Sequence, residues 1–176
     1  MNPSVRVAVK SSAGGPLRRV WLAASEMGLF RVALNKSRGE FLSSLGGDIR
    51  IAKDDSAWVL PAARQIDEYL KGTRRSFSLR LAIDGLPPFS RAVIEELRKV
   101  PCGNTITYGE LACRAGSPGA SRAVGNIMAA NPLPLVIPCH RVVAKSGLGG
   151  FGGGLDLKRR LLRHEGAVFL DTEPGL

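Results

Sequence analysis

The chain of 176 residues has no apolar run of the roughly 20 residues that a helix needs to cross a bilayer. Its first ten residues lack the basic, apolar and small-residue layout of a signal peptide. It has only three cysteines, Cys102, Cys113 and Cys139, an odd number without the spacing of a metal site. We therefore expect no disulfide framework and no membrane segment, and we expect the protein to be cytoplasmic.

Acidic residues are scarce relative to basic ones. The chain has 15 Asp and Glu against 25 Lys and Arg, which gives a formal net charge of +10. The excess is spread over both halves, so no basic tail accounts for it. Such a charge suits a polyanionic partner, nucleic acid first and an anionic membrane second. Because 44% of the residues are hydrophobic, the chain can also bury a core, and global disorder is not expected.

The first half is predicted to be a small sheet with a helix. Three short β-branched or apolar segments are separated by turn residues, and a fourth segment alternates between apolar and polar residues. A helical pattern lies between the third and the fourth, with Pro61 inside it as an alternative start. The predicted strands are Val5–Lys10, Arg19–Ser25, Gly28–Leu34 and Phe77–Ile83, and the predicted helix is Ser56–Leu70.

A Gly-Leu-Pro-Pro stretch after Asp84 marks a domain boundary, and we predict domains at 1–86 and 87–176. The second domain is predicted to be mainly helical. Thr107 and Glu110 have the spacing of a capping box, and the two middle helices resemble a helix-turn-helix. The predicted helices are Phe89–Val100, Tyr108–Ala115, Ala120–Asn131 and Leu155–Glu165, the last stopped by Gly166.

The helix at 120–131 carries almost only small side chains and one arginine, Arg122. A helix that reads the major groove normally has several long polar side chains. A small-residue face instead permits close approach to a minor groove, and a single long cation there can enter the base stack. The alternative is an ordinary alanine-rich helix with one solvated arginine.

The segment Pro138-Cys139-His140-Arg141-Val142 follows an apolar run and places a thiol beside an imidazole and a cation. Cysteine is a good nucleophile only as the thiolate, which a neighbouring imidazole or cation favours. The alternative is that Cys139 is simply a small buried apolar residue, as free cysteines often are.

The glycine-rich stretch at 147–154 does not have the Gly-Lys-Ser/Thr of a phosphate loop, so we reject a nucleotide site there. Close backbone approach to a flat ligand fits the glycines better. The three cations that follow, Lys158, Arg159 and Arg160, are predicted to form a solvated helix face, with phosphate contacts as the alternative.

From about Phe89 to Ala167 the chain resembles the O6-alkylguanine-DNA alkyltransferases, also called methylated-DNA–protein-cysteine methyltransferases. Each matching piece is short, but six in order at the family's spacing are highly specific. The pieces are Thr107-Tyr-Gly-Glu-Leu-Ala, Ser121-Arg-Ala-Val-Gly, Asn131-Pro-Leu-Pro, Ile137-Pro-Cys-His-Arg-Val-Val, the glycine-rich loop and Leu161-Leu-Arg-His-Glu-Gly.

The resemblance implies an α/β N-terminal domain with a ribonuclease-H-like sheet, acting as a support. A mainly α C-terminal domain with a helix-turn-helix would follow it and bind DNA. It also implies a double-stranded DNA partner that contains alkylated guanine, and no cofactor. A monomer in the cytoplasm, nucleoid-associated in a prokaryote, is expected. The thioether product is a poor leaving group, so each molecule would act once.

The resemblance also assigns catalytic roles. Cys139 would accept the alkyl group from guanine O6, and His140 would act as general base, through a water. Glu165 would orient the imidazole as the third member of a triad does. Asn131 would tie the Cys139 segment to the DNA-binding helix. Tyr108 would crowd the phosphate and bond the flipped guanine.

The remaining implied residues bind DNA and the flipped base. Arg122 would fill the gap in the stack, which partly offsets the cost of flipping. The residues expected against the minor groove are Ala120, Ser121, Ala123 and Gly125. Those expected at the substrate are Tyr108, Pro134, Phe151, Gly152, Gly153 and Val142, with the carbonyls of Cys139 and Val142 accepting from the guanine amine.

Two departures from the family pattern carry consequences. Many relatives have Tyr at the position of Phe151 and Ser at that of Gly152, so tolerance for bulky alkyl groups is in doubt. Some relatives bind a structural zinc through N-terminal Cys and His. Residues 1–101 here contain neither, so no such zinc is predicted.

Three other functions compete with alkyl transfer. An alkyltransferase-like module that flips the base without repair would lack the cysteine that stands at Cys139. A transcription regulator would need base-reading side chains on its second helix. A cysteine hydrolase using Cys139, His140 and Glu165 would give Arg122 and the small-residue helix no role.

Overall fold

The computed structural model describes residues 5–46, 49–51, 56–83 and 85–171. The chain divides into two compact units, residues 1–84 and residues 85–176.

The first unit is built on a four-stranded sheet in the order β3-β2-β1-β4. Strands β1 (Val5–Gly14), β2 (Leu17–Ser25) and β3 (Gly28–Leu34) form an antiparallel meander. The three strands were predicted, but β1 continues to Gly14, past the predicted end at Lys10. Strand β4 (Ile49–Ile51) pairs parallel to β1 and has only three residues, too few for its alternation to be visible in the sequence.

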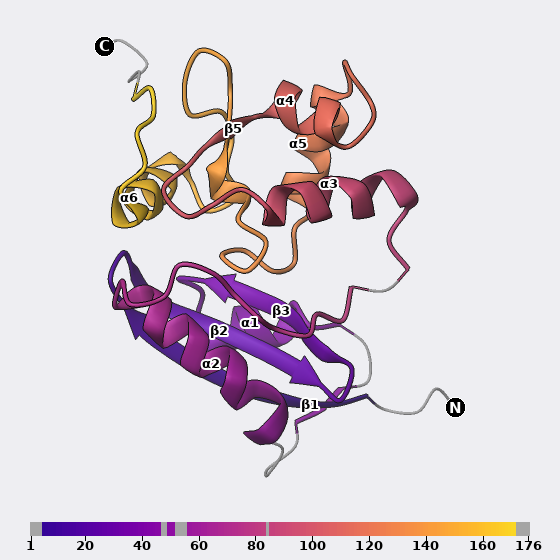
Figure 1. Cartoon of the computed structure of the whole chain (residues 1–176). Coiled ribbons are helices and arrows are strands. Elements are labelled where there is room, and N and C mark those ends of the chain that lie inside the picture. Colours follow the sequence, from indigo (N-terminus) through magenta and orange to yellow (C-terminus); the bar gives the residue numbers. More distant parts are fainter. Residues whose placement is uncertain (1–4, 47–48, 52–55, 84, 172–176) are drawn as a thin grey trace. The chain divides into compact units, whose positions relative to one another are not determined.

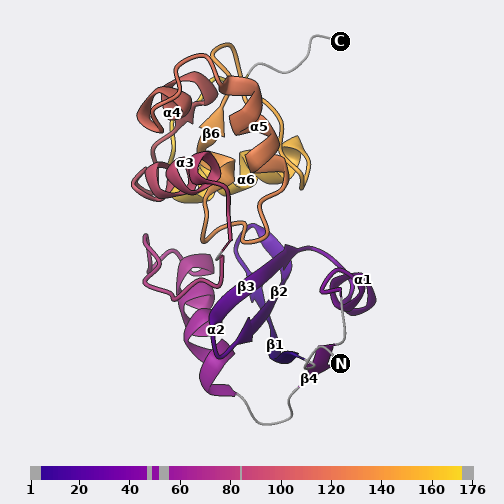
Figure 2. The ribbon, with the colours of Figure 1, turned by 90° about the vertical axis from the view of Figure 1, so that its right-hand side faces the viewer.

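From Val20 to Ser25 strand β2 is buried on both faces, because one helix covers each side of the sheet (Figure 2). On one face Trp21 and Ala23 pack with Phe41 of α1 (Arg38–Ser43), and the rings of Trp21 and Phe41 stack with centroids 5.7 Å apart. The predicted helix α2 (Ser56–Leu70) lies against the other face, with Pro61 inside it. The capping box of Ser37 and Glu40 is the sequence signal for α1 that our prediction missed.

The predicted strand Phe77–Ile83 is wrong as a regular strand. It makes one parallel bridge, Leu81 to Leu29, with two backbone hydrogen bonds around it. The reason lies in Gln65 of α2, whose side-chain amide bonds both the N–H and the carbonyl of Ser78. These bonds satisfy backbone groups that a sheet ladder would otherwise use.

The second unit is mainly helical, and its helices lie where the sequence predicted them, with ends shifted by two residues at most (Figure 1). Thr107 and Glu110 form the predicted capping box at the start of α4. Fully buried leucine and isoleucine side chains from the helices and from the segment before Cys139 make the core. The helices are α3 (Pro88–Arg98), α4 (Tyr108–Arg114), α5 (Ser121–Ala129) and α6 (Leu155–Glu165).

A short parallel ladder positions the segment that holds Cys139. Strand β5 (Ile106–Thr107) pairs with β6 (Val142–Val143), Thr107 opposite Val143. Since β5 leads directly into α4 and β6 follows the 3₁₀ turn η1 (Cys139–Arg141), the first residue of α4 is brought beside that turn. No helix in the described part of the chain is long and apolar enough to span a membrane.

Candidate active site

Cys139 begins η1 and is buried, with 6% of its surface exposed. The side chain of Asn131, just after α5, donates from Nδ2 to the carbonyl of Ile137 at 2.8 Å and accepts from the N–H of Leu133 at 2.9 Å. Leu135 between them is fully buried and has a left-handed φ of 74°. The segment is therefore bent sharply and fixed to the end of α5 by the Asn131 amide.

His140, fully buried, meets the carboxylate of Glu165 from α6. Its Nε2 lies 2.8 Å from Glu165 Oε1. Its other ring nitrogen, Nδ1, is buried and has no hydrogen-bond partner among the described residues. With Glu165 ionised, Nε2 is the donor in this pair, which makes Nδ1 the basic nitrogen.

Arg141 forms a bidentate pair with the same carboxylate. Its Nε and Nη2 donate to the two oxygens of Glu165 at 2.8 and 2.9 Å, and its Nη1 donates to the carbonyl of Val100 at 2.7 Å. The N–H of Gly103 adds a longer bond at 3.3 Å. His140, Arg141 and Gly103 thus all hold the Glu165 carboxylate. From the sequence Arg141 was expected to act as a cation near the thiol, and in the structure it pairs with Glu165.

Burial sets the direction of the pKa shift for Cys139 and His140, but not for Glu165. It raises the pKa of the Cys139 thiol, although a hydrogen bond from Asn131 and the charge of Lys158 oppose it. It lowers the pKa of His140 despite the hydrogen bond to Glu165. For Glu165 burial would raise the pKa, but the hydrogen bonds and charges of His140 and Arg141 outweigh it and hold the pKa below its usual range. At neutral pH the site holds a thiol, a neutral imidazole and a carboxylate.

Tyr108, the first residue of α4, lies against the glycine-rich loop. Its hydroxyl donates to the carbonyl of Gly150 at 3.2 Å, and burial raises its pKa. Gly149 has a φ of +67°, and a Cβ there would meet the Tyr108 ring at 2.8 Å. A Cβ at Gly153 would meet Phe151 and Leu157 just as closely. These two glycines therefore make room for aromatic rings of the protein itself.

A pocket of about 450 Å³ opens beside Cys139. The sequence predicted four of its lining residues other than the cysteine, although it placed Gly125 against DNA. It missed Met128, Ala129 and Gly150. The lining residues are Tyr108, Gly125, Met128, Ala129, Cys139, Gly150, Phe151 and Gly152.

Three residues expected at the substrate are not in this lining. Pro134 is half-buried and bridges Ile137, Gly153 supports Phe151, and Val142 is fully buried in β6. Met128 follows Val124 by four residues on the buried stripe of α5, so its helical spacing was the available signal.

The prediction that Lys158 and Arg159 form a solvated face is wrong. Lys158 is fully buried, and its Nζ donates to three backbone carbonyls. Arg159 is mostly covered and pairs with Asp156 and Asp171. Arg160 alone is exposed, as expected. In the sequence Lys158 and Arg159 are simply polar residues of a helix. In the structure Lys158 lies on the buried face of α6, together with Leu157, Leu161 and Leu162.

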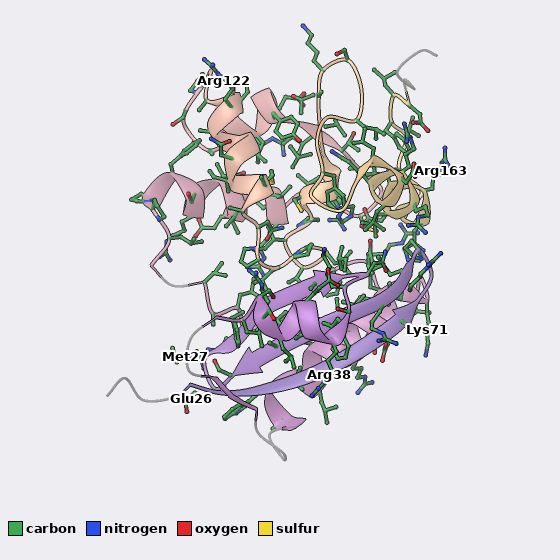
Figure 3. The ribbon with its side chains drawn as sticks, turned by 180° about the vertical axis from the view of Figure 1, so that it is seen from behind. Glu26, Met27, Arg38, Lys71, Arg122 and Arg163 are labelled. Atoms are coloured by element: carbon green, nitrogen blue, oxygen red, sulfur yellow. The ribbon has the colours of Figure 1, made fainter. Side chains whose placement is uncertain are left out.

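The outer face of α5 carries the arginine that the sequence singled out. Arg122 is exposed, and Figure 3 shows it extending from the protein at the end of the second unit. Ala123 beside it is exposed, and Ala120, Ser121 and Gly125 are half-buried. Within the described ranges, no group of three or more His, Cys, Asp or Glu residues could hold a metal ion.

Comparisons with known proteins agree on one family. Residues 88–167 match the model of the 6-O-methylguanine DNA methyltransferase, DNA binding domain. A methylated-DNA–protein-cysteine methyltransferase of Methanosarcina acetivorans is 37% identical over 159 residues, which are 86% of this chain and 94% of that protein. A protein of the same name from Salmonella typhimurium is 43% identical over 107 residues, 60% of this chain and 63% of that one.

Solved structures give the same result. The structure of Mycobacterium tuberculosis OGT in complex with DNA has a TM-score of 0.76 and 31% identity, covering 92% of this chain and 93% of that one. The O6-methylguanine-DNA methyltransferase of Pyrococcus kodakaraensis has a TM-score of 0.64 and 29% identity, covering 92% and 99%. With Cys139 lining a pocket, its chain neighbour His140 paired with Glu165, and relatives of this name matched over most of both chains, the chain belongs to the methylated-DNA–protein-cysteine methyltransferase family.

Proposed function

We propose that this protein repairs DNA by direct reversal, moving the alkyl group of O6-alkylguanine irreversibly to Cys139. The observation that carries the proposal is the placement of Cys139 at a pocket of about 450 Å³, beside a buried His140–Glu165 pair, in a chain of this family. O4-alkylthymine is a further candidate substrate. The reaction needs no cofactor, because the alkyl group comes from the damaged base.

The thiol is the resting form of Cys139, since burial raises its pKa. His140 is neutral and carries its basic lone pair on Nδ1, an atom with no hydrogen-bond partner among the described residues. Leaving such a buried atom unpaired costs about 1–3 kcal/mol. A water between Nδ1 and the Cys139 sulfur would remove this cost and provide the path by which the thiol proton leaves.

The transfer is an in-line displacement at the alkyl carbon. The bond between the Cys139 sulfur and that carbon forms while the bond to guanine O6 breaks. The departing guanine takes up one ring proton, and the thiol gives up one, so the reaction balances as a thioether and an unmodified guanine. Tyr108, which lies at the pocket, is the proposed proton donor to the guanine, and the proton that leaves the thiol restores the tyrosine hydroxyl. Glu165 orients His140 and stabilises its cationic form.

DNA binding is assigned to α4 and α5, as a helix-turn-helix that enters the minor groove. The support is the pair of adjacent helices and the exposed end of α5, where Arg122 stands among small residues. Arg122 would occupy the place of the flipped nucleotide. Ala120, Ser121, Ala123 and Gly125 would let the backbone approach the sugars. The proposed location is the cytoplasm, with association with the nucleoid in a prokaryote.

The first unit is proposed to be a ribonuclease-H-like support domain. The support for this fold is the strand order β3-β2-β1-β4, with an antiparallel meander and with β4 parallel to β1. In the second unit Pro134 and Gly153 are proposed to shape the pocket by supporting the residues that line it. The carbonyls of Cys139 and Val142 are proposed to accept hydrogen bonds from the guanine amine.

The test is mass spectrometry of the intact protein and its peptides after mixing with one equivalent of duplex DNA that carries a single O6-methylguanine. The expected result is one added methyl group per molecule, confined to the Cys139 peptide. Cys139→Ala, the control, should bind the duplex and gain no mass. Tight binding by the wild-type protein without any gain would mean a damage-sensing module, and turnover without DNA would mean a hydrolase.

A further inference from the structure

Lys158 is the one lysine that the structure buries fully among the residues whose burial is described. Its Nζ donates to the carbonyls of Val142 at 2.5 Å, Leu148 at 2.6 Å and Gly150 at 3.1 Å. An ammonium has three donors, and all three are used. No carboxylate pairs with it in the described part of the chain, so carbonyl dipoles alone offset the cost of burying its charge.

The three carbonyls belong to the two segments that form the site. Val142 directly follows the η1 turn that begins with Cys139. Leu148 and Gly150 belong to the glycine-rich loop 147–154, whose Gly150, Phe151 and Gly152 line the pocket. The Gly150 carbonyl also accepts from the Tyr108 hydroxyl. One ammonium therefore joins α6, the cysteine segment and the loop.

Beyond the bridge of Gly147 to Ala144 and the buried Leu148 side chain, few contacts of the loop are hydrogen bonds. Residues 148–152 form no helix or strand, and glycine loses more conformational freedom on folding than any other residue. Among the described residues, the hydrogen bonds that reach 148–152 are those from Lys158, the one from Tyr108 and one turn bond, Gly154 N–H to the carbonyl of Phe151. Without Lys158, the carbonyls of Val142 and Leu148 would lose a donor in buried surroundings, and the carbonyl of Gly150 would keep only Tyr108 of the two.

We propose that Lys158 is a positioning residue that fastens the glycine-rich loop 147–154 to the Cys139 segment and keeps the alkyl pocket formed before DNA arrives. The inference rests on the proposed alkyl transfer and refines it. A loop that becomes ordered only when the substrate binds reduces the binding free energy by the entropy lost on ordering. A loop that is already ordered avoids this loss. Lys158 contacts backbone carbonyls and does not touch the reacting atoms.

The test compares Lys158→Met with Lys71→Met, the same change at an exposed lysine of the first unit (Figure 3). Two rates are measured for each. One is single-turnover methyl transfer from an O6-methylguanine duplex, and the other is alkylation of Cys139 by iodoacetamide without DNA. For Lys158→Met we expect transfer to fall on the order of 100-fold, as misplacement of a positioning segment does. Alkylation is measured across pH, because loss of the Lys158 charge also raises the pKa of the Cys139 thiol. The limiting rate of the thiolate should stay equal or rise, because an open loop does not obstruct a small reagent.

Hydrogen exchange supplies a third readout that needs no substrate. In Lys158→Met the amides of 147–154 should exchange faster, while those of β2 and α5 keep their protection. Lys71→Met should match the wild type in all three measurements. Should Lys158→Met fail to fold, Lys158→Gln, which keeps two amide donors, should give intermediate values of transfer rate and loop exchange.

The outcomes separate cleanly. Transfer by Lys158→Met within threefold of the wild type, or unchanged exchange of the loop, overturns the proposal. A fall of transfer that the raised pKa of the thiol fully accounts for also overturns it, since Lys158 would then act on the thiol itself. If the wild-type protein takes up no methyl group, the proposed function fails, while the exchange and iodoacetamide arms still judge the role of Lys158.

Discussion

The two units differ in what they bury. In the first unit the charged pairs whose burial is described lie at the surface, such as Arg64 and Arg74 with Glu68, and the core is apolar. In the second unit His140, Arg141, Lys158 and Glu165 are all buried. Removing charges from water costs several kcal/mol per ion unless they are well paired. The difference teaches that the first unit is arranged for stability. The second unit instead buries charged groups around the cysteine, at a cost in stability.

The largest effect is expected where a buried carboxylate of the second unit loses its charge. Glu165→Gln leaves the Arg141 cation buried without its partner, which should lower the free energy of unfolding by about 3–5 kcal/mol. It also removes the orientation of His140, so methyl transfer should slow on the order of 1000-fold. Urea denaturation and single-turnover kinetics measure the two effects.

The matched control is Glu68→Gln in the first unit, which removes the charge of a partly exposed carboxylate. It should cost less than about 1 kcal/mol and leave transfer unchanged. Equal losses for the two substitutions would contradict the contrast between the units.

The next largest effect is expected when the core of the first unit is disrupted: stability should fall, while the transfer rate should not. Phe41 is fully buried and stacks on Trp21, so Phe41→Ala should lower the free energy of unfolding by about 3–5 kcal/mol. The transfer rate of the protein that remains folded should stay within twofold of the wild type, measured at low temperature. A much slower transfer would mean that the first unit takes part in the chemistry.

Acid should weaken the second unit through Glu165 and His140. The pKa of Glu165 is held below its unfolded value of about 4.3, so the unfolded chain binds a proton more readily, and the stability from this group is lost as the pH falls below that value. The difference in unfolding free energy between wild type and Glu165→Gln should therefore shrink as the pH is lowered through 4.

The pH dependence of transfer should follow His140. Burial lowers its pKa, so it stays neutral and basic down to below about pH 6.5, the usual value for histidine. The single-turnover rate should be nearly flat from pH 8 to 6.5 and should decline at lower pH, approaching tenfold per unit below the lowered pKa. A decline that begins above pH 7 would contradict a neutral imidazole at rest.

The smallest effect concerns the close packing of the glycine-rich loop. Gly149→Ala puts a Cβ 2.8 Å from the Tyr108 ring at a φ of +67°, so transfer should slow about tenfold through displacement of the loop or of Tyr108. Gly39→Ala in α1, where a Cβ meets nothing within 4 Å, should leave transfer unchanged and slightly stabilise the protein. Equal transfer rates for the two variants would show that the loop can shift to accommodate the extra methyl group without slowing the reaction.

Much of the molecule could be predicted from local patterns. The meander strands, the helices of the second unit and the Thr107–Glu110 capping box depend on neighbours in sequence, and periodicity reports them. The same reasoning failed at Phe77–Ile83, because the contacts of Gln65 with Ser78, thirteen residues apart, replaced a sheet ladder. It also missed β4, which exists only through its pairing with β1.

By itself the sequence determined the family, the helices and strands with strong periodicity, and which cysteine stands beside a histidine. Only the tertiary structure decided that Lys158 is buried on carbonyls 8 to 16 residues away, and that Glu165 is shared between His140 and Arg141. It also decided that Met128 faces the pocket. The physical reason is that burial and charge pairing depend on which chain segments meet in space, and a helical pattern shows a polar residue without showing what lies against it.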